Sequence, residues 1–116
     1  MPRNRSLFAT IALLMLLGCA AARPPGTFAD SGPLHANTLR LNADGTFSYE
    51  AWSDGGGMFW RAEGTWQWLE GDRFATEIAK VTLGSEDFPP LARYQVWRVT
   101  GRGVLRESTL FKPRSE

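Results

Sequence analysis

The sequence predicts an all-β fold, a small antiparallel up-and-down meander of six or seven strands that closes into a barrel. Apolar and polar residues alternate with a period of two through most of residues 38–111, as in strands with one buried face. Clusters of Gly, Pro, Asn and Asp separate the alternating runs and mark turns. No segment after residue 19 shows the i, i+3, i+4, i+7 apolar spacing of an amphipathic helix. Such consecutive hairpins hide one face most readily by curling into a barrel or a small sandwich, of which we favour the barrel.

The first hairpin joins two strands through a turn at residues 42–45. Leu39 and Leu41 lie on one face of its first strand, and Gly45 falls at the turn position that needs a positive φ. The second strand covers residues 46–52. One face of this strand carries Phe47, Tyr49 and Ala51, and the other carries Ser48, Glu50 and Trp52.

The longest predicted strand covers residues 58–68 and follows a glycine-rich loop at residues 53–57. One face of this strand carries Met58, Trp60, Ala62, Gly64, Trp66 and Trp68. A glycine weakens a strand unless the chain bends or another backbone comes close, so Gly64 predicts a bulge or bend that lets Trp66 join the core. The next strand, residues 74–83, exchanges its faces between Ile78 and Val81, which predicts a second irregularity.

The C-terminal part predicts two more strands. Residues 84–92 are polar and stiffened by two adjacent prolines, so we expect a surface loop. Residues 94–99 form the next strand, Gly101-Arg102-Gly103 turns the chain, and residues 104–111 form the last strand.

The chain begins with the layout of a secretory signal peptide. Arg3 and Arg5 supply positive charge without an acidic residue, and residues 7–17 are almost wholly apolar. We expect this apolar core to form a short signal-peptide helix. It is too short to span a membrane, because a spanning helix needs about 20 residues.

The four residues that close the apolar core, Leu16-Leu17-Gly18-Cys19, resemble the lipobox of bacterial lipoproteins. The resemblance implies that cleavage falls between Gly18 and Cys19, and that Cys19 carries lipid on its thiol and, as palmitate, on its new amino group. Two acyl chains give stable membrane attachment, whereas one gives marginal binding. Ala20 replaces the aspartate that often retains such proteins at the inner membrane, which implies the outer membrane, facing the periplasm. The alternative is an ordinary secretory signal cleaved within residues 20–22, with Cys19 incidental.

Four regions are therefore predicted along the chain. They are a lipoprotein signal peptide at 1–18, a lipidated N-terminus and flexible tether at 19–33, the barrel domain at 34–112 and a frayed tail at 113–116. The tether is rich in Ala, Gly and Pro, which disfavour a helix. An alternative is that residues 26–28 form a first edge strand.

Charge and cysteine content exclude several kinds of partner and cross-link. The formal net charge is only +1, and loss of Arg3 and Arg5 with the signal reverses its sign. A nucleic-acid partner is not expected, because nucleic-acid-binding domains carry a clustered basic face. Cys19 is the only cysteine, so no intramolecular disulfide forms and stability must come from packing of the aromatic residues.

The polar residues form no recognisable catalytic or metal-binding set. We expect His35 to be a solvated loop histidine, and Asp44 and Asp54 to bond their own turns. Glu86-Asp87 supplies too few oxygen ligands for a closed calcium site. Cross-strand ion pairs are the expected role of Glu50, Glu63, Glu77, Arg61 and Arg98. We therefore predict no enzyme activity, no cofactor and no metal.

A second resemblance concerns the domain itself. Leu39, Leu41 and Asp44-Gly45-Thr46-Phe47, followed by Gly64-Thr65-Trp66 and a Gly71-Asp72 turn, resemble the small lipocalin-like domains of bacterial envelope proteins. The resemblance implies a small barrel. Full lipocalins are longer and commonly carry a terminal helix, so a roomy ligand cavity is not expected.

Two functions remain open for the domain. The first is a protein-interaction or scaffold module that contacts another envelope protein. The alternative is a barrel mouth that binds a small apolar or aromatic ligand. Candidates to line such a pocket are Phe47, Tyr49, Trp60, Trp66, Trp68 and Trp97. Aromatic residues at period two in so small a domain are first of all expected to be its core, which favours the interaction module.

Overall fold

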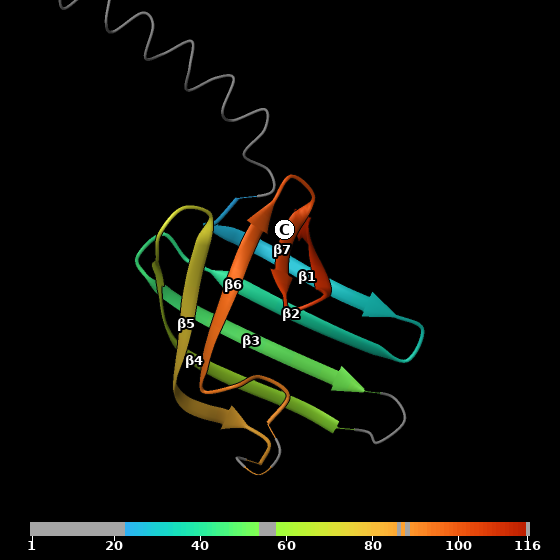
Figure 1. Cartoon of the computed structure of the whole chain (residues 1–116). Helices are drawn as coiled ribbons and strands as arrows, with labels where there is room; N and C mark the ends of the chain where they lie inside the picture. Colours follow the sequence, from blue (N-terminus) through green and yellow to red (C-terminus); the bar gives the residue numbers. More distant parts are fainter. Residues whose placement is uncertain (1–22, 54–57, 86, 88, 116) are drawn as a thin grey trace, which may run out of the picture.

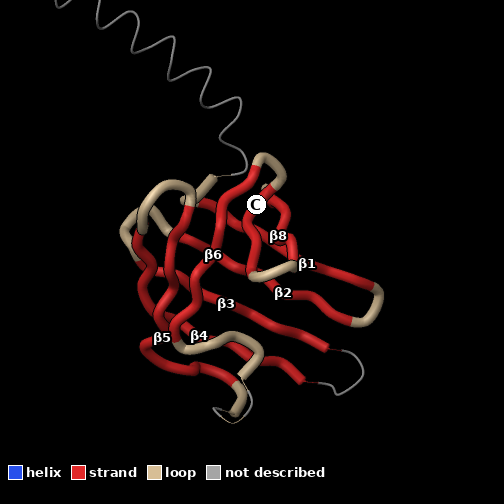
Figure 2. Tube along the Cα trace, viewed as in Figure 1, coloured by secondary structure: helices blue, strands red, loops and turns tan. Residues whose placement is uncertain are grey.

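The described residues form a closed barrel of eight antiparallel strands. The computed structural model describes residues 23–53, 58–85, 87 and 89–115; the predicted signal peptide and Cys19 lie outside this range. Each strand pairs with its sequence neighbours, and β8 returns to β1 (Figure 1). In chain order the strands are β1 Gly26–Gly32, β2 His35–Leu41, β3 Thr46–Ser53, β4 Met58–Trp68, β5 Arg73–Leu83, β6 Tyr94–Thr100, β7 Gly103–Arg106 and β8 Thr109–Arg114. In this part of the chain Figure 2 shows strands and loops without a helix. The predicted all-β meander is confirmed, with eight strands instead of six or seven.

The first additional strand, β1, lies in the segment predicted as a tether. It pairs with β2 along its whole length and with β8 over Thr27 to Ala29. Phe28 points into the barrel and is 1% exposed. The tether prediction is therefore corrected: the barrel begins at Gly26, as the edge-strand alternative allowed. Both sides of β1 are paired at Phe28, because β8 closes the barrel there.

The second additional strand arises because residues 104–111 form a hairpin and not a single strand. Glu107 and Ser108 make a tight turn between β7 and β8, and Glu107 adopts the left-handed region with φ 56°. The turn contains neither glycine nor proline, so turn composition did not reveal it. β8 continues to Arg114, so the predicted fraying from residue 113 is also corrected.

The predicted turn at residues 42–45 is confirmed. Gly45 has φ 90°, and the Gly45 N–H donates to the Asn42 carbonyl oxygen at 3.1 Å. Asp44 Oδ1 accepts hydrogen bonds from the Thr46 hydroxyl at 2.6 Å and from the Thr46 N–H at 3.0 Å. These two hydrogen bonds lower the pKa of Asp44, and the bond from the Thr46 hydroxyl has the larger effect. Asp44 therefore has the turn-stabilising role expected from the sequence.

The predicted irregularity at Gly64 is also confirmed. The register of β4 against β5 shifts beside Gly64 and again between Arg61 and Ala62, so one residue of β5 is skipped at each point. A methyl group on Gly64 would overlap the Glu77 carbonyl oxygen and lie 2.9 Å from the Ala79 nitrogen. Gly64 thus permits the close approach of the two backbones. Figure 1 shows that β5 bends sharply in its second half, where these bulges lie.

Aromatic side chains fill the centre of the barrel. The Trp97 ring stacks on Phe74 with ring centroids 6.0 Å apart and meets Phe111 edge-on at 5.1 Å. The Trp97 indole N–H donates to the buried Thr76 hydroxyl at 3.0 Å, which satisfies both polar groups. Tyr49 contacts Trp60, Trp97 and Phe111. The core residues that are at most 2% exposed include Phe28, Leu39, Leu41, Phe47, Tyr49, Phe74, Trp97, Val104 and Phe111.

The loop between β5 and β6 contributes one core residue. Leu91 is 1% exposed and belongs to the same cluster as the strand residues. Asp87, Pro89 and Pro90 of this loop are exposed, as expected. The surface-loop prediction for residues 84–92 is therefore correct for these residues and wrong for Leu91.

Candidate functional site

The two ends of the barrel differ. One end contains Arg23, where the described chain begins, and the short turns that follow β2, β4 and β6 (Figure 1). In an up-and-down barrel the other connections meet at the opposite end. This end, which we call the mouth, contains residues 33–34, the ends of β3 and β4 at Ser53 and Met58, loop 84–93 and turn 107–108.

On β1, β2, β3 and β7, inward-facing positions change from apolar to polar as the strands reach the mouth. Side chains two residues apart on a strand point to the same face, so the core residues define which neighbours also point inward. On β1, Phe28 is followed by Asp30; on β7, Val104 is followed by Arg106. By the same rule the mouth ends of β2 and β3 contribute Asn37, His35 and Ser53. The mouth is therefore polar above an aromatic core.

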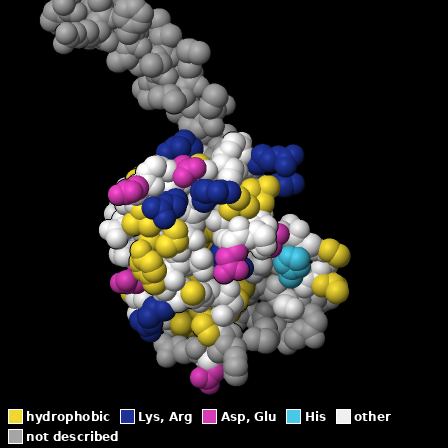
Figure 3. Space-filling view, viewed as in Figure 1, with side chains coloured by type: hydrophobic (Ala, Val, Ile, Leu, Met, Phe, Trp, Pro, Cys, Tyr) yellow, Lys and Arg dark blue, Asp and Glu magenta, His cyan; other side chains and the backbone are white. Residues whose placement is uncertain are grey.

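Three of these polar residues form a connected group. Asn37 Nδ2 donates to Asp30 Oδ2 at 3.4 Å, and His35 Nε2 lies 3.4 Å from the same oxygen. The His35 side chain is 48% exposed, and the single histidine appears in cyan at the surface in Figure 3. His35 is solvated as predicted, but it belongs to strand β2 and not to a loop.

Arg106 covers the core at the mouth. Its Nη1 donates to the Tyr49 hydroxyl and to the Pro90 carbonyl oxygen, both at 3.0 Å. Its guanidinium carbon lies 5.6 Å from the centre of the Tyr49 ring, 5.8 Å from that of Trp97 and 5.4 Å from that of Phe111. Burial raises the pKa of Tyr49, and the nearby Arg106 charge opposes this shift only in part. Tyr49 therefore stays a neutral hydroxyl that accepts a hydrogen bond from Arg106.

A hollow of about 250 Å³ opens at the mouth. The Trp60 indole N–H, which donates to the Ser85 carbonyl oxygen at 2.9 Å, ties β4 to loop 84–93 at this hollow. The residues that line it are His35, Asn37, Ala51, Trp52, Ser53, Trp60, Ser85, Asp87 and Pro90.

The six aromatic residues proposed from the sequence to line a ligand do not gather in one pocket. Phe47, Tyr49 and Trp97 are core residues, and Trp60 is a core residue that also lines the hollow. Trp66 and Trp68 lie near the opposite end, where they line a separate groove of about 340 Å³.

Trp66 is partly buried against the core, and its indole N–H donates to the Asn42 carbonyl oxygen at 2.8 Å. Trp68 is 40% exposed. Asn37, Ser53 and Arg106 were not predicted from the sequence to lie at the mouth. The sequence pattern that could have indicated them is a polar residue at a strand position that faces inward.

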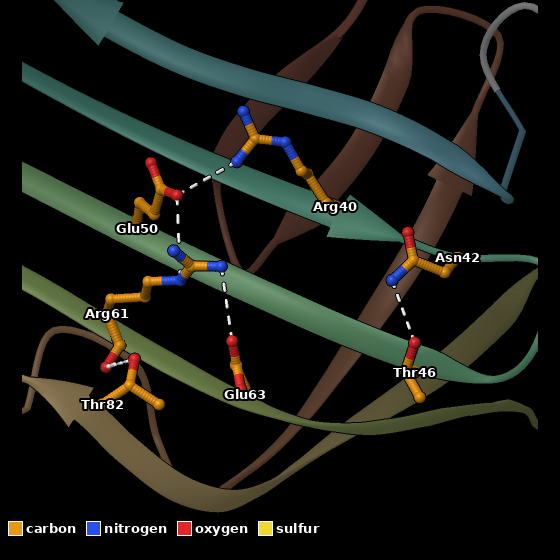
Figure 4. A network of polar contacts seen from close by, with 7 residues as sticks. All are labelled: Arg40, Asn42, Thr46, Glu50, Arg61, Glu63 and Thr82. Carbon is orange, nitrogen blue, oxygen red and sulfur yellow. Dashed lines mark hydrogen bonds and ion pairs between the residues drawn. The ribbon is translucent and has the colours of Figure 1, made fainter.

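A network of charges lies on the outer face of β2, β3 and β4 (Figure 4). Arg40 Nη1 donates to Glu50 Oε1 at 3.1 Å, Arg61 Nε lies 3.9 Å from the same oxygen, and Arg61 Nη2 lies 3.3 Å from Glu63 Oε1. The predicted cross-strand pairing is confirmed for Arg61 with Glu50, whereas Glu63 contacts Arg61 from the same strand, β4.

The remaining predicted partners lie elsewhere, because Glu77 is opposite Thr65 and Tyr94, and Arg98 is opposite Arg73. An open depression of about 580 Å³ adjoins the network, with Lys80 and Ser48 at its edge. Because both signs of charge are already paired here, the network serves the sheet and offers little free charge to a ligand.

Large apolar side chains are exposed on the outer face near the mouth. Trp52 and Phe59 are directly opposite each other on β3 and β4, and each is 42% exposed. Leu83 of β5 is opposite Arg61, which is two residues from Phe59 on β4, so Leu83 lies on the same outer face as Phe59. Leu83 is 48% exposed. We call Trp52, Phe59 and Leu83 the outer patch.

Among residues 23–115 as far as they are described, no group of three His, Cys, Asp or Glu side chains is placed to hold a metal ion. The same residues include no helix long and apolar enough to cross a membrane. Comparison with protein-family models, curated proteins and solved structures gives no match.

Proposed function

We propose that this protein is an envelope lipoprotein, anchored through Cys19, whose barrel is a protein-interaction module. The outer patch is the observation that carries the proposal. Trp52, Phe59 and Leu83 expose large apolar side chains on the neighbouring strands β3, β4 and β5. Contiguous apolar surface of this kind marks interaction sites in soluble domains.

The filled interior supports the same conclusion. A barrel that carries a ligand inside needs space at its centre, but here Trp97 packs on both Phe74 and Phe111. Most ligand pockets enclose about 300–1,000 Å³. The aromatic residues of the centre thus stabilise the domain, and its outer surface is left to contact a partner.

The orientation of the barrel suits this role. The described chain begins at Arg23, close to Cys19 in sequence and at the end opposite the mouth. An anchor at Cys19 would hold that end near the lipid. The mouth and the outer patch would then face away from the membrane, toward periplasmic domains of another envelope protein.

Photo-crosslinking in cells tests the interaction module. A photoreactive amino acid replaces Phe59 in the patch or Gln67, which lies on the same face of β4 at the opposite end. We expect a specific envelope protein to be crosslinked from position 59, not from position 67, and the product to disappear with Trp52→Ser. Equal crosslinking from both positions, or none from position 59, contradicts the proposal.

Metabolic labelling tests the anchor separately. With radioactive palmitate, the wild type should be labelled and should fractionate with membranes, and Cys19→Ser should lose both properties. If label and membrane association persist in Cys19→Ser, the lipoprotein proposal is wrong.

A second candidate function is binding of a small ligand at the mouth, and the hollow beside Trp60 favours it. Its volume of about 250 Å³ is below the usual range for drug-sized ligands. Any ligand must therefore be small, and it would sit above the core and not within it.

A further inference from the structure

We propose that the mouth hollow binds a small organic cation, such as a quaternary or primary ammonium group. This inference deepens the second candidate function and rests on it; it does not depend on the interaction module. It is carried by the polar groups that line the hollow, by two tryptophans beside them, and by the lack of lysine and arginine among the described residues that line it.

The hollow offers hydrogen-bond acceptors to a ligand, and among the polar side chains that line it His35 and Ser53 can also donate. Asp87 contributes a carboxylate on the exposed part of loop 84–93. The Asn37 amide nitrogen donates to Asp30, so the amide oxygen is the end left for a ligand. Ser53 adds a hydroxyl. A cation that donates hydrogen bonds, or that needs only negative surroundings, fits these groups better than an anion does.

Two arginines beside the hollow are committed to other contacts. Arg93, which lines an adjoining hollow with Asp87 and Trp60, donates to the Ile78 carbonyl oxygen at 3.4 Å. Arg106 Nη1 binds the Tyr49 hydroxyl and the Pro90 carbonyl oxygen, and its guanidinium covers three ring faces. It does not line the hollow. Asp30 is in contact with His35 and Asn37, which sets the positions of these two lining residues. Among the lining residues, Asp87 therefore supplies the one fixed charge, and that charge is negative.

The aromatic part of the lining suits an organic cation. Trp60 points inward and lines the hollow, where its hydrogen bond to the Ser85 carbonyl oxygen holds it in place, and Trp52 of the outer face lies at the edge of the hollow. Tryptophan is the aromatic side chain that attracts cations most strongly, and aromatic surroundings recognise quaternary ammonium groups. The small volume limits the ligand to a compact head group.

Titration of the purified full-length protein with choline tests the proposal. Calorimetry measures the dissociation constant, and the indole N–H resonance of Trp60, assigned by its loss in Trp60→Phe, reports on the site. The control ligand is the uncharged analogue of choline in which a tert-butyl group replaces trimethylammonium. The variants are Asp87→Asn and, as a matched loss of one negative charge at the opposite end, Glu70→Gln.

We expect choline to shift the Trp60 resonance. The uncharged analogue should bind at least about tenfold more weakly than choline. Asp87→Asn should weaken choline binding about tenfold or more, the usual effect of losing one charge-assisted contact, and added salt should weaken it as well. Glu70→Gln should bind as the wild type does.

The remaining outcomes overturn defined parts of the proposal. Equal binding of choline and its uncharged analogue would leave ligand binding at the mouth intact and overturn the cation specificity. Choline binding that is unchanged in Asp87→Asn would overturn the role of Asp87. No binding of either compound and no change at Trp60 would overturn both the cation site and the second candidate function, while the interaction module would be unaffected.

Discussion

Replacement of Gly64 by alanine tests the bend on which the barrel depends. The added methyl group would overlap the Glu77 carbonyl oxygen and lie 2.9 Å from both the Glu77 carbonyl carbon and the Ala79 nitrogen. These are backbone atoms of a paired strand, so the overlap is relieved only if β5 moves away from β4. Overpacking of this kind costs about 1–3 kcal/mol, occasionally more. That is a large part of the roughly 5–15 kcal/mol that holds a domain folded.

Urea unfolding followed by tryptophan fluorescence measures this loss. With a slope of about 1 kcal/mol/M, a loss of about 2 kcal/mol lowers the urea midpoint by about 2 M. The matched control is Gly101→Ala, because a methyl group there has no neighbouring atom within 4 Å and Gly101 does not have a positive φ. The free energy of unfolding of the control should change by less than about 0.5 kcal/mol. If Gly64→Ala matches Gly101→Ala, the close approach of β4 and β5 does not constrain residue 64 and the reasoning is refuted.

Three further predictions concern other parts of the barrel. Arg106→Met should lower the free energy of unfolding by about 1–3 kcal/mol, because the hydrogen bonds to Tyr49 and Pro90 and the ring contacts are lost; exposed Arg102→Met should change it by less than about 0.5 kcal/mol, and equal effects would contradict this role. Trp66→Ala should cost about 1–3 kcal/mol, less than the roughly 3–5 kcal/mol of a fully buried tryptophan, because Trp66 is only partly buried; an unchanged urea midpoint would show that it does not pack on the core. The variant Tyr94→Phe leaves Tyr49 as the single tyrosine. Because burial raises the pKa of Tyr49, tyrosinate absorbance should appear only at pH values above the usual tyrosine pKa of about 10. Ionisation with a pKa at or below that value would contradict the burial. Since the pKa of Tyr49 is raised in the folded state, its contribution to stability is complete below about pH 10 and is lost as the pH rises further.

The alternation of residues allowed most of the fold to be predicted, because period two is a direct consequence of strand geometry. It located the hairpin around Gly45 and the faces of β3. The bulge at Gly64 was predictable because a glycine in mid-strand needs a reason to be there. These features depend only on residues close together in the sequence, which is the range that pattern analysis covers.

The missed features depend on contacts distant in the sequence or on turns without marker residues. β1 is stable because both β2 and β8 pair with it, and its own composition of small and polar residues gives little sign of a strand. The turn at Glu107 and Ser108 lacks glycine and proline. Leu91 is buried because loop 84–93 packs onto the core, which its proline-rich surroundings do not indicate.

The mouth residues were missed for a different reason. Asp30, Asn37 and Arg106 lie at inward positions, but a polar residue next to an apolar one is ordinarily assigned to the solvent side. Counting by two from Phe28, Leu39 and Val104 would have placed them inside. The core residues thus supply the register, and the polar residues that share it are the signal of a site.

The outer patch and the mouth hollow share one residue, which links the two proposals. Trp52 belongs to the exposed patch on β3 and also lines the hollow. A partner that covers the patch would therefore contact Trp52, and a ligand in the hollow would lie beside the same residue. If both sites are used, occupancy of one changes the affinity of the other, and by thermodynamic linkage the two effects are equal in size. The partner identified by crosslinking would then change the affinity for choline by a certain factor. Choline would change the affinity for that partner by the same factor.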